Sequence, residues 1–207
     1  RSKTRVLPNG VDLSQFSGSP RDDVLATYGI PKEKRLVVFT GNWEGWIAVD
    51  DAIRSSDFLP DQYCVVIVGH GIGLEQYRKN APKAILTGRI PHADVVQIVL
   101  QAYACVYPYS DNPVAMGRSS RKTLEYLAAG KPIIASDTPN REELLVPVIN
   151  ALLYKPGDSQ DLAAKVLQLS NDTELYRRMA ANNRKLAEDW SWDRVLERSG
   201  LMELTHS

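Results

Sequence analysis

The sequence is poor in the features that would place it in several common protein classes. Its 207 residues include two cysteines, Cys64 and Cys105, and each falls within a run predicted to be a strand. This excludes a disulfide framework and indicates two buried free thiols. Lysine plus arginine equals aspartate plus glutamate at 25 each, so no excess charge argues for nucleic acid or an acidic membrane as a partner.

Long hydrophobic runs are also absent. No apolar stretch approaches the roughly 20 residues that cross a bilayer, and no signal peptide opens the chain. We therefore expect a soluble, cytoplasmic protein. The first residues show neither a start methionine nor a targeting pattern, so we expect a fragment of a longer protein.

The motifs of the commonest phosphate, dinucleotide and metal sites are missing as well. There is no Gly-x-x-x-x-Gly-Lys-Ser/Thr phosphate loop. The glycine-rich stretch 69–73 follows a predicted strand, but Leu74 stands where the dinucleotide fingerprint needs its third glycine, which argues against a redox enzyme. We expect His92, just before a predicted helix, to be a local cap or a surface residue. No metal-ligand spacing connects the three histidines, His70, His92 and His206.

What the sequence does have is a regular alternation of short apolar runs with amphipathic stretches. The apolar runs predict strands over 36–40, 63–68, 84–87, 104–109, 133–136 and 150–154. The amphipathic stretches predict helices over 47–55, 74–80, 92–101, 159–170, 173–189 and 192–204, with a further helix that starts near 119 and ends at Gly130. This alternation predicts an α/β fold, a Rossmann-like doubly wound parallel sheet of about six strands with helices on both faces.

In such sheets, ligands bind outside the carboxyl ends of the strands. The rule gathers the loops that follow the first four strands, together with the helix start near 119, around one crevice. Glycine stands at three of these strand ends, and its small size lets a backbone approach a ligand closely. The loop residues that we expect to line the crevice are Gly41, Asn42, Gly69, Gly71 and Tyr109.

The helix near 119 carries cations where a helix disfavours them. Ser119 or Ser120 can cap its start, and Arg118, Arg121 and Lys122 cluster there. Because a helix N-terminus is partly positive and attracts phosphate, three cations at that end suggest that an anion binds there.

One turn further along, Glu125 offers a carboxylate with two acceptor oxygens, which suits the vicinal hydroxyls of a ribose or a sugar. A second interpretation is equally open from local sequence. Arg121 and Glu125 are four residues apart, so they can form an ordinary ion pair on a solvated helix face.

Residues 122–137, KTLEYLAAGKPIIASD, resemble the signature of retaining GT-B glycosyltransferases of the group 1 (family 4) type. Three other segments are similar to that family: 6–12 (VLPNGVD), 150–158 (NALLYKPGD) and 190–193 (WSWD). The resemblance covers nearly the whole chain and implies the C-terminal, nucleotide-sugar-binding half of a two-domain enzyme. It implies an entry segment over 1–18, a donor-binding domain over 19–190, and a helix over 191–207 that crosses back to a missing N-terminal acceptor domain.

The resemblance also assigns roles to single positions. Glu125 would hold the ribose hydroxyls, the backbone N–H groups of Ser119 and Ser120 would hold the diphosphate, and Lys122 or Arg121 would neutralise the leaving group. The remaining assignments are main-chain contacts of Arg89 and Ile90 to the base, and close passage of the phosphates at Gly41. No metal or other cofactor is implied. The donor would be a UDP-type or GDP-type sugar, and peripheral association with the inner face of a membrane would occur through the missing half.

Two departures from the family pattern keep other interpretations open. Gly117 stands where members usually carry a first glutamate, and the first-strand loop reads Asn-Trp-Glu-Gly-Trp over 42–46 where a basic pair is usual. Lys122 and Arg118 would then take over the phosphate role. The alternatives are a GT-B relative of another class, such as a nucleotide-sugar epimerase, and a non-catalytic nucleotide-binding module. If the last helix crosses to another domain, it should be partly unburied here at Leu196, Leu201, Met202 and Leu204, whereas Trp190 and Trp192 should be packing anchors.

Overall fold

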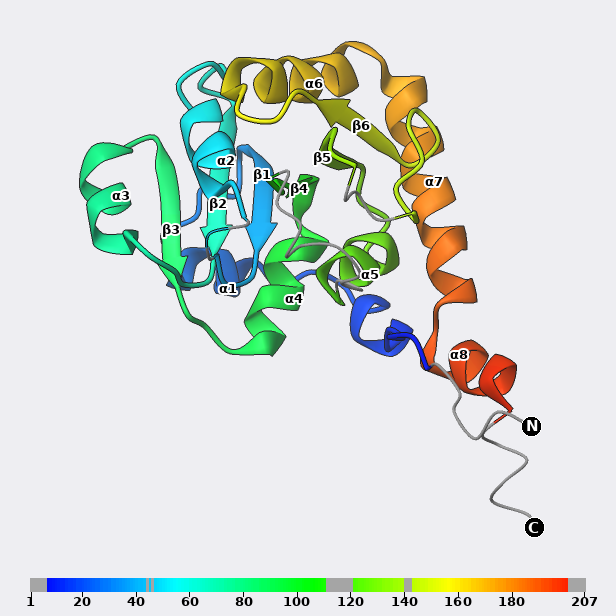
Figure 1. Ribbon diagram of the computed structural model, residues 1–207. Helices are drawn as coiled ribbons and strands as arrows, with labels where there is room; N and C mark the ends of the chain where they lie inside the picture. Colours follow the sequence, from blue (N-terminus) through cyan, green and yellow to red (C-terminus); the bar gives the residue numbers. More distant parts are fainter. Residues whose placement is uncertain (1–6, 44, 46, 111–120, 140–142, 201–207) are drawn as a thin grey trace.

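A computed structural model describes residues 7–43, 45, 47–110, 121–139 and 143–200. Its centre is a six-stranded, all-parallel sheet in the order β3-β2-β1-β4-β5-β6 (Figure 1). The strand order turns back between β1 and β4, which is the doubly wound arrangement that the alternating sequence predicts. The strands are β1 (Arg35–Thr40), β2 (Tyr63–Val68), β3 (Ala84–Gly88), β4 (Ala102–Tyr107), β5 (Ile133–Ser136) and β6 (Ala151–Tyr154).

Helices cover both faces of this sheet, and two separate hydrophobic cores result. One core joins η1 (Leu13–Phe16), α1 (Asp22–Thr27), α4 (His92–Leu100) and α5 (Arg121–Ala128) to one face. The other core joins α2 (Val49–Ser55) and α6 (Ser159–Asn171) to the opposite face. The long helix α7 (Thr173–Asp189) contributes to both cores, and α3 (Leu74–Asn80) lies beside the edge strand β3 (Figure 1).

The strands read as continuous apolar runs because both faces of the sheet are buried. Along β1, Leu36 and Val38 belong to one core while Val37 and Phe39 belong to the other. The two cysteines behave as the sequence predicts: Cys64 on β2 and Cys105 on β4 are buried free thiols.

After α7 the chain returns to the segment that opens the described structure. The backbone N–H of Val11 donates to the carbonyl of Trp190 (2.9 Å), and that of Trp192 donates to the carbonyl of Val11 (3.1 Å). A side-chain carbon on Gly10 would lie 2.7 Å from the indole of Trp192, so only glycine lets the ring lie this close. Trp190 packs on the core as predicted, whereas Trp192 is 39% exposed and is a weaker anchor than expected.

The last described helix, α8 (Trp192–Ser199), is shorter than predicted. The sequence suggested a helix to residue 204, but Gly200 adopts a left-handed conformation (φ 65°), and its N–H closes the last turn on the carbonyl of Glu197. That geometry ends a helix. Leu196 is half-buried, as expected, while Leu201, Met202 and Leu204 lie outside the described residues. The division of the chain at residues 18 and 190 stays a prediction.

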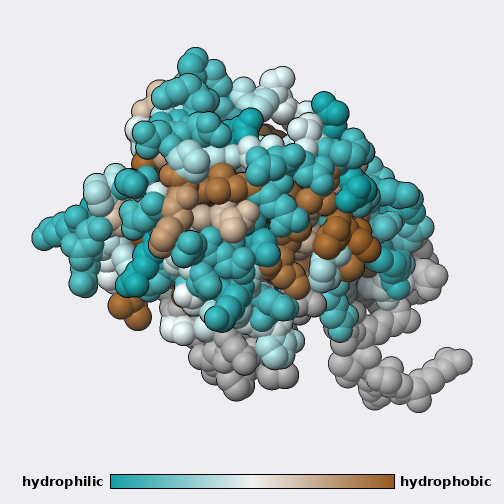
Figure 2. All heavy atoms as spheres, turned by 90° about the horizontal axis from the view of Figure 1, so that it is seen from above, coloured by the Kyte–Doolittle hydropathy of each residue, from teal (hydrophilic) through white to brown (hydrophobic). Residues whose placement is uncertain are grey.

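The face of the molecule seen in Figure 2 is largely hydrophilic, with hydrophobic side chains gathered in patches between the hydrophilic ones. Three exposed aliphatic residues, Val146, Val148 and Ile149, lie in the loop that leads into β6. Within the described part of the chain, no helix combines the length and the apolar character needed to cross a membrane.

Candidate functional site

A cavity of about 340 Å³ opens at the carboxyl ends of β1, β2 and β3, where the fold predicts a ligand. The starts of α4 and α5 form its opposite wall. Its lining includes most of the residues that the sequence placed there, namely Gly41, Asn42, Gly69, Arg89, Ile90, Arg121, Lys122 and Glu125. Thr40, Val68, His92 and Val95 complete it.

The strand ends that form the floor are joined by backbone hydrogen bonds beyond the strands themselves. The N–H of Gly41 donates to the carbonyl of Val68 (2.8 Å), and that of Gly69 donates to the carbonyl of Gly88 (3.0 Å). The two loops touch so closely that a side-chain carbon on Gly69, whose φ is +135°, would lie 2.1 Å from the carbonyl oxygen of Gly41. Gly69 is therefore required because the two loops pack directly against each other at this point.

Lys122 places its ammonium group at the end of β1. Its Nζ would lie 2.9 Å from a side-chain carbon on Gly41, so the missing side chain of that glycine leaves the space that Lys122 uses. The same Nζ lies 4.7 Å from the centre of the Phe39 ring and 5.5 Å from that of Tyr109, which is the range of cation–π attraction. A positive charge is thus held at the wall of the cavity.

Glu125 lies one turn beyond Arg121, the first residue of α5, and only 14% of its side chain is exposed. Its Oε1 lies 3.0 Å from Nε2 of His92 and 3.9 Å from the guanidinium of Arg121. A carboxylate has about four acceptor positions, so these contacts leave capacity for ligand hydroxyl groups. The local ion pair and the ligand-binding carboxylate that the sequence offered as alternatives are therefore compatible in geometry.

Several residues expected at the site lie elsewhere or outside the described chain. Gly71 lies against Trp43, with a side-chain carbon at this position 2.3 Å from the Trp43 carbonyl oxygen, and does not line the cavity. Tyr109 is buried behind Lys122 and stacked on Tyr107 with 4.1 Å between ring centres. The expected phosphate-binding residues Arg118, Ser119 and Ser120, and the departures at Gly117 and Glu44, lie outside the described residues.

His92 is the site residue that the sequence interpretation missed. It was expected to be a cap or a surface residue, and its side chain is indeed 49% exposed, but its ring also contacts Glu125 and lines the cavity. One signal was available: His92 follows the third strand after a short loop, so the rule that gathers the carboxyl ends of strands also applies to it.

A second cavity of about 390 Å³ adjoins the first, and His92, Arg121 and Glu125 line both. Its other walls come from Asn9, Gly10, Val11, Asp12, Gln15, Phe16 and Trp192. The described residues hold no group of three or more His, Cys, Asp and Glu side chains that could bind a metal ion.

Comparison with known proteins agrees with this fold. Residues 20–186 match the family described as glycosyl transferases group 1. The chain is 28% identical over 186 residues to a GDP-mannose-dependent alpha-mannosyltransferase of Mycobacterium tuberculosis, a match that covers 87% of this chain and 46% of that protein. The chain therefore spans less than half the length of this curated relative.

Two solved structures share the architecture. Anabaena HepE, determined in complex with UDP, superposes with a TM-score of 0.76 at 19% identity, over 95% of this chain and 56% of that one. The C-terminal domain of the group 1 glycosyl transferase LpcC from Francisella tularensis gives a TM-score of 0.68 at 21% identity, over 86% of this chain and 97% of that domain. These likenesses establish a GT-B-type fold, and the family match extends over most of the chain. The protein belongs to the group 1 glycosyl transferase family.

Proposed function

We propose that this chain is the donor-binding half of a retaining glycosyltransferase, which moves a sugar from a nucleoside-diphosphate sugar to an acceptor such as a glycan or a lipid carrier. The observation that carries the proposal is the shared cavity of Lys122 and Glu125 at the carboxyl ends of the strands. A fixed cation beside a carboxylate matches a ligand that carries phosphate at one end and neighbouring hydroxyl groups at the other.

The two residues have different tasks in the reaction. Departure of a nucleoside diphosphate builds negative charge on the leaving phosphate, and preorganised positive groups stabilise that charge. Lys122 is held in place by the rings of Phe39 and Tyr109, and Arg121 adds a second, 70% exposed cation. Glu125 binds the ribose hydroxyls, while Arg89 and Ile90, which line the same cavity, contact the base.

The relatives support this ligand class and leave its base open. One is GDP-mannose-dependent by name, and the superposed HepE structure holds UDP. The proposal therefore includes either a UDP-type or a GDP-type donor and requires no metal. It also includes an N-terminal acceptor domain in the rest of the protein, through which the enzyme would meet the cytoplasmic face of a membrane.

The test is a titration of this chain with UDP, GDP and ADP, with NAD as a non-donor control, followed by thermal unfolding and calorimetry. A ligand that binds only the folded state stabilises it by roughly 2.7 kcal/mol at a hundredfold excess over its dissociation constant. We expect one nucleoside diphosphate to bind, with affinity lost in Glu125→Ala.

Lys122→Met tests binding of the phosphate end of the ligand separately from binding of the nucleoside end. It should weaken binding of the nucleoside diphosphate by about tenfold or more, since a hydrogen bond to a charged group is lost. Binding of the matching free nucleoside, which has no phosphate, should be unchanged. If no nucleoside diphosphate binds, or if binding survives both substitutions, the proposed donor site is wrong.

A further inference from the structure

His92 and Glu125 come from different helices, 33 positions apart in the sequence, and meet at 3.0 Å. Because a carboxylate accepts hydrogen bonds, the ring nitrogen Nε2 of His92 carries the proton in this contact. Arg121 is 3.9 Å from the carboxylate and its side chain is 70% exposed, against 49% for His92, so it constrains the carboxylate less. Of these two partners, His92 is the one at hydrogen-bonding distance.

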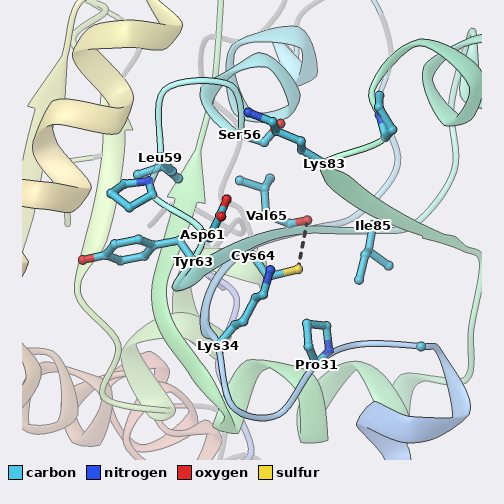
Figure 3. Close-up of a pocket in the computed structure, with 13 residues that line it drawn as sticks. Pro31, Lys34, Ser56, Leu59, Asp61, Tyr63, Cys64, Val65, Lys83 and Ile85 are labelled. Atoms are coloured by element: carbon cyan, nitrogen blue, oxygen red, sulfur yellow. Dashed lines mark hydrogen bonds between the residues drawn. The ribbon is translucent and has the colours of Figure 1, made fainter.

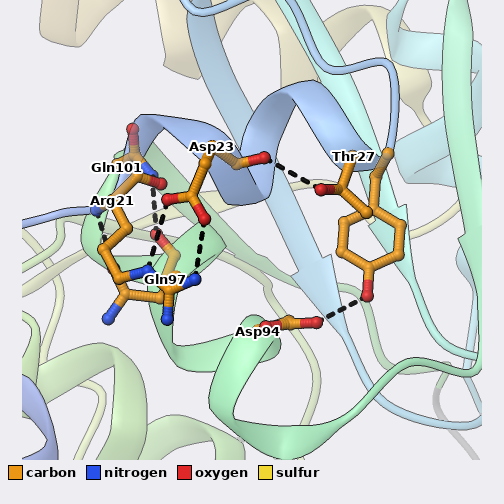
Figure 4. Close-up of polar contacts among 7 residues, drawn as sticks. Arg21, Asp23, Thr27, Asp94, Gln97 and Gln101 are labelled. Carbon is orange, nitrogen blue, oxygen red and sulfur yellow. Dashed lines mark hydrogen bonds and ion pairs between the residues drawn. The ribbon is translucent and has the colours of Figure 1, made fainter.

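The His92 ring is carried by a helix whose position is itself fixed. It is the first residue of α4, directly after Pro91. Three hydrogen bonds link α4 to the α1 segment: Tyr28 donates its hydroxyl to Asp94 (2.6 Å), Gln97 accepts from the N–H of Arg21 (2.8 Å), and Gln101 donates to the Arg21 carbonyl (3.1 Å) (Figure 4). The bond to Asp94 falls in the first turn of α4 and the bond to Gln101 at its C-cap, so the helix that carries His92 is tied to the α1 segment along its length.

The position of the pair gives the contact a task. His92, Arg121 and Glu125 form the shared wall of the donor cavity and of the second cavity beside Asp12 and Trp192. A glutamate has three rotatable side-chain bonds, and ordering such a side chain costs up to about 1.5–2 kcal/mol. A carboxylate on a wall with open space on both sides needs a partner if it is to meet a ligand in one orientation.

We infer that His92 is a positioning residue, which holds one oxygen of Glu125 so that the carboxylate is oriented in advance for the ribose hydroxyls of the donor. The inference rests on the proposed donor site and assigns that site a second residue. Preorganisation of this kind raises affinity because the ordering has already taken place before the ligand arrives. A substitution of His92 should therefore lower affinity only for ligands that have ribose hydroxyls.

The experiment measures that dependence directly. Dissociation constants are determined by calorimetry for the nucleoside diphosphate that binds the wild-type chain and for its 2′,3′-dideoxy counterpart. The variants are His92→Phe, which keeps a ring and removes the donor, His92→Gln, which restores an N–H donor, and Arg121→Gln. Urea unfolding of each variant checks that the fold is intact.

For His92→Phe we expect about fivefold weaker binding of the ribose ligand, the scale of one hydrogen bond, and an unchanged constant for the dideoxy ligand. His92→Gln should restore binding to within about twofold if its amide reaches Glu125. Arg121→Gln should weaken binding of both ligands equally, because the charge of Arg121 acts on the diphosphate that both ligands carry.

The outcomes separate this inference from the proposed function. If His92→Phe weakens both ligands equally, or neither, while Glu125→Ala still abolishes the preference for ribose, the donor site stands and the positioning role of His92 is wrong. A failure of His92→Gln to recover any affinity would equally count against a role for the N–H donor. If the wild-type chain binds no nucleoside diphosphate at all, the proposed function fails first.

Discussion

The hydroxyl oxygen of Tyr126, on α5, accepts a hydrogen bond from the backbone N–H of Thr40 at 2.8 Å. The same oxygen lies 3.0 Å from the Thr40 side-chain hydroxyl, and both residues are buried. Burial raises the pKa of the Tyr126 hydroxyl well above its usual range, so it stays protonated. This contact ties the helix that carries Lys122 and Glu125 to the residue before Gly41, and so links the two walls of the cavity.

Tyr126→Phe should destabilise the protein by about 1–3 kcal/mol, because it leaves the buried N–H of Thr40 without its acceptor. It should also weaken binding of the nucleoside diphosphate, since the end of β1 is no longer tied to α5. Urea unfolding and calorimetry measure the two effects.

A matched control is Tyr154→Phe. This tyrosine is equally buried and donates its hydroxyl to Asp51 (3.0 Å) in the core on the opposite face of the sheet. It should lower stability and leave nucleotide affinity unchanged. Equal effects of the two substitutions on affinity would argue against a specific link between Tyr126 and the cavity.

Alanine substitutions at three glycines with positive φ should distinguish the cost of backbone strain from the cost of a steric clash with a neighbouring atom. Gly29, at φ +65°, has no neighbouring atom within 4 Å of the position that a side-chain carbon would take, so Gly29→Ala should cost only the conformational penalty of about 1–2 kcal/mol. Gly69→Ala should destabilise by about 3 kcal/mol or more, because the added carbon meets the rigid carbonyl of Gly41.

Gly41→Ala should behave differently from both, because the added carbon meets the flexible end of Lys122. The lysine can move, so stability should fall less than in Gly69→Ala, while nucleoside-diphosphate affinity should fall as it does in Lys122→Met. A variant that kept wild-type affinity would show that the close approach of Lys122 to Gly41 has no part in binding.

The strands could be predicted from the sequence because each is encoded by a short run of apolar residues that are consecutive in the chain. The strands Tyr63–Val68 and Ile133–Ser136 have the predicted bounds, since each is an apolar run closed by glycine, proline or polar residues. The fourth strand was predicted two residues late: β4 already begins at Ala102, and Tyr107 is its last residue before Pro108. Pro108 cannot donate to a sheet, which explains that end.

Two features were not predicted from the sequence, the end of α8 and the contact between His92 and Glu125, and they have a different physical origin. Gly200 ends α8, but the apolar residues after it continued the helical pattern and suggested a longer helix. The contact between His92 and Glu125 depends on how α4 and α5 pack, and no spacing within either helix encodes it. Glu125 itself was found because the family signature contains it, whereas nothing in that signature points to His92.

Among the described residues, Val148 is the only non-glycine residue with a positive φ, at 64°. A β-branched side chain is strained in this region, while asparagine tolerates it. Because Val148 is 55% exposed, little burial is lost on substitution. Val148→Asn should therefore raise the free energy of unfolding by about 1 kcal/mol, as measured in urea. Val146→Asn, in the same loop without the positive φ, is the control and should not stabilise.

Cys64 should react slowly with thiol reagents although it borders open space. It lines a cavity of about 440 Å³ at the amino ends of the strands, with Lys34, Asp61 and Lys83 around it (Figure 3). Burial raises the pKa of its thiol to about 11, and the neighbouring Lys34 offsets only part of this rise. Because the thiolate is the reactive form, alkylation by iodoacetamide at pH 8 should be roughly a hundredfold slower than in the unfolded chain.

The rate at Cys64 should then rise about tenfold per pH unit between pH 8 and 10, as the thiolate fraction does. Cys105 is fully buried on β4 and lines none of the cavities described above, so it reports alkylation through opening of the fold. Peptide mass spectrometry of the native protein distinguishes the two thiols. Labelling of Cys64 at the unfolded rate would mean that its thiol is not desolvated, and equal labelling of both cysteines would mean that reagent enters only when the sheet opens.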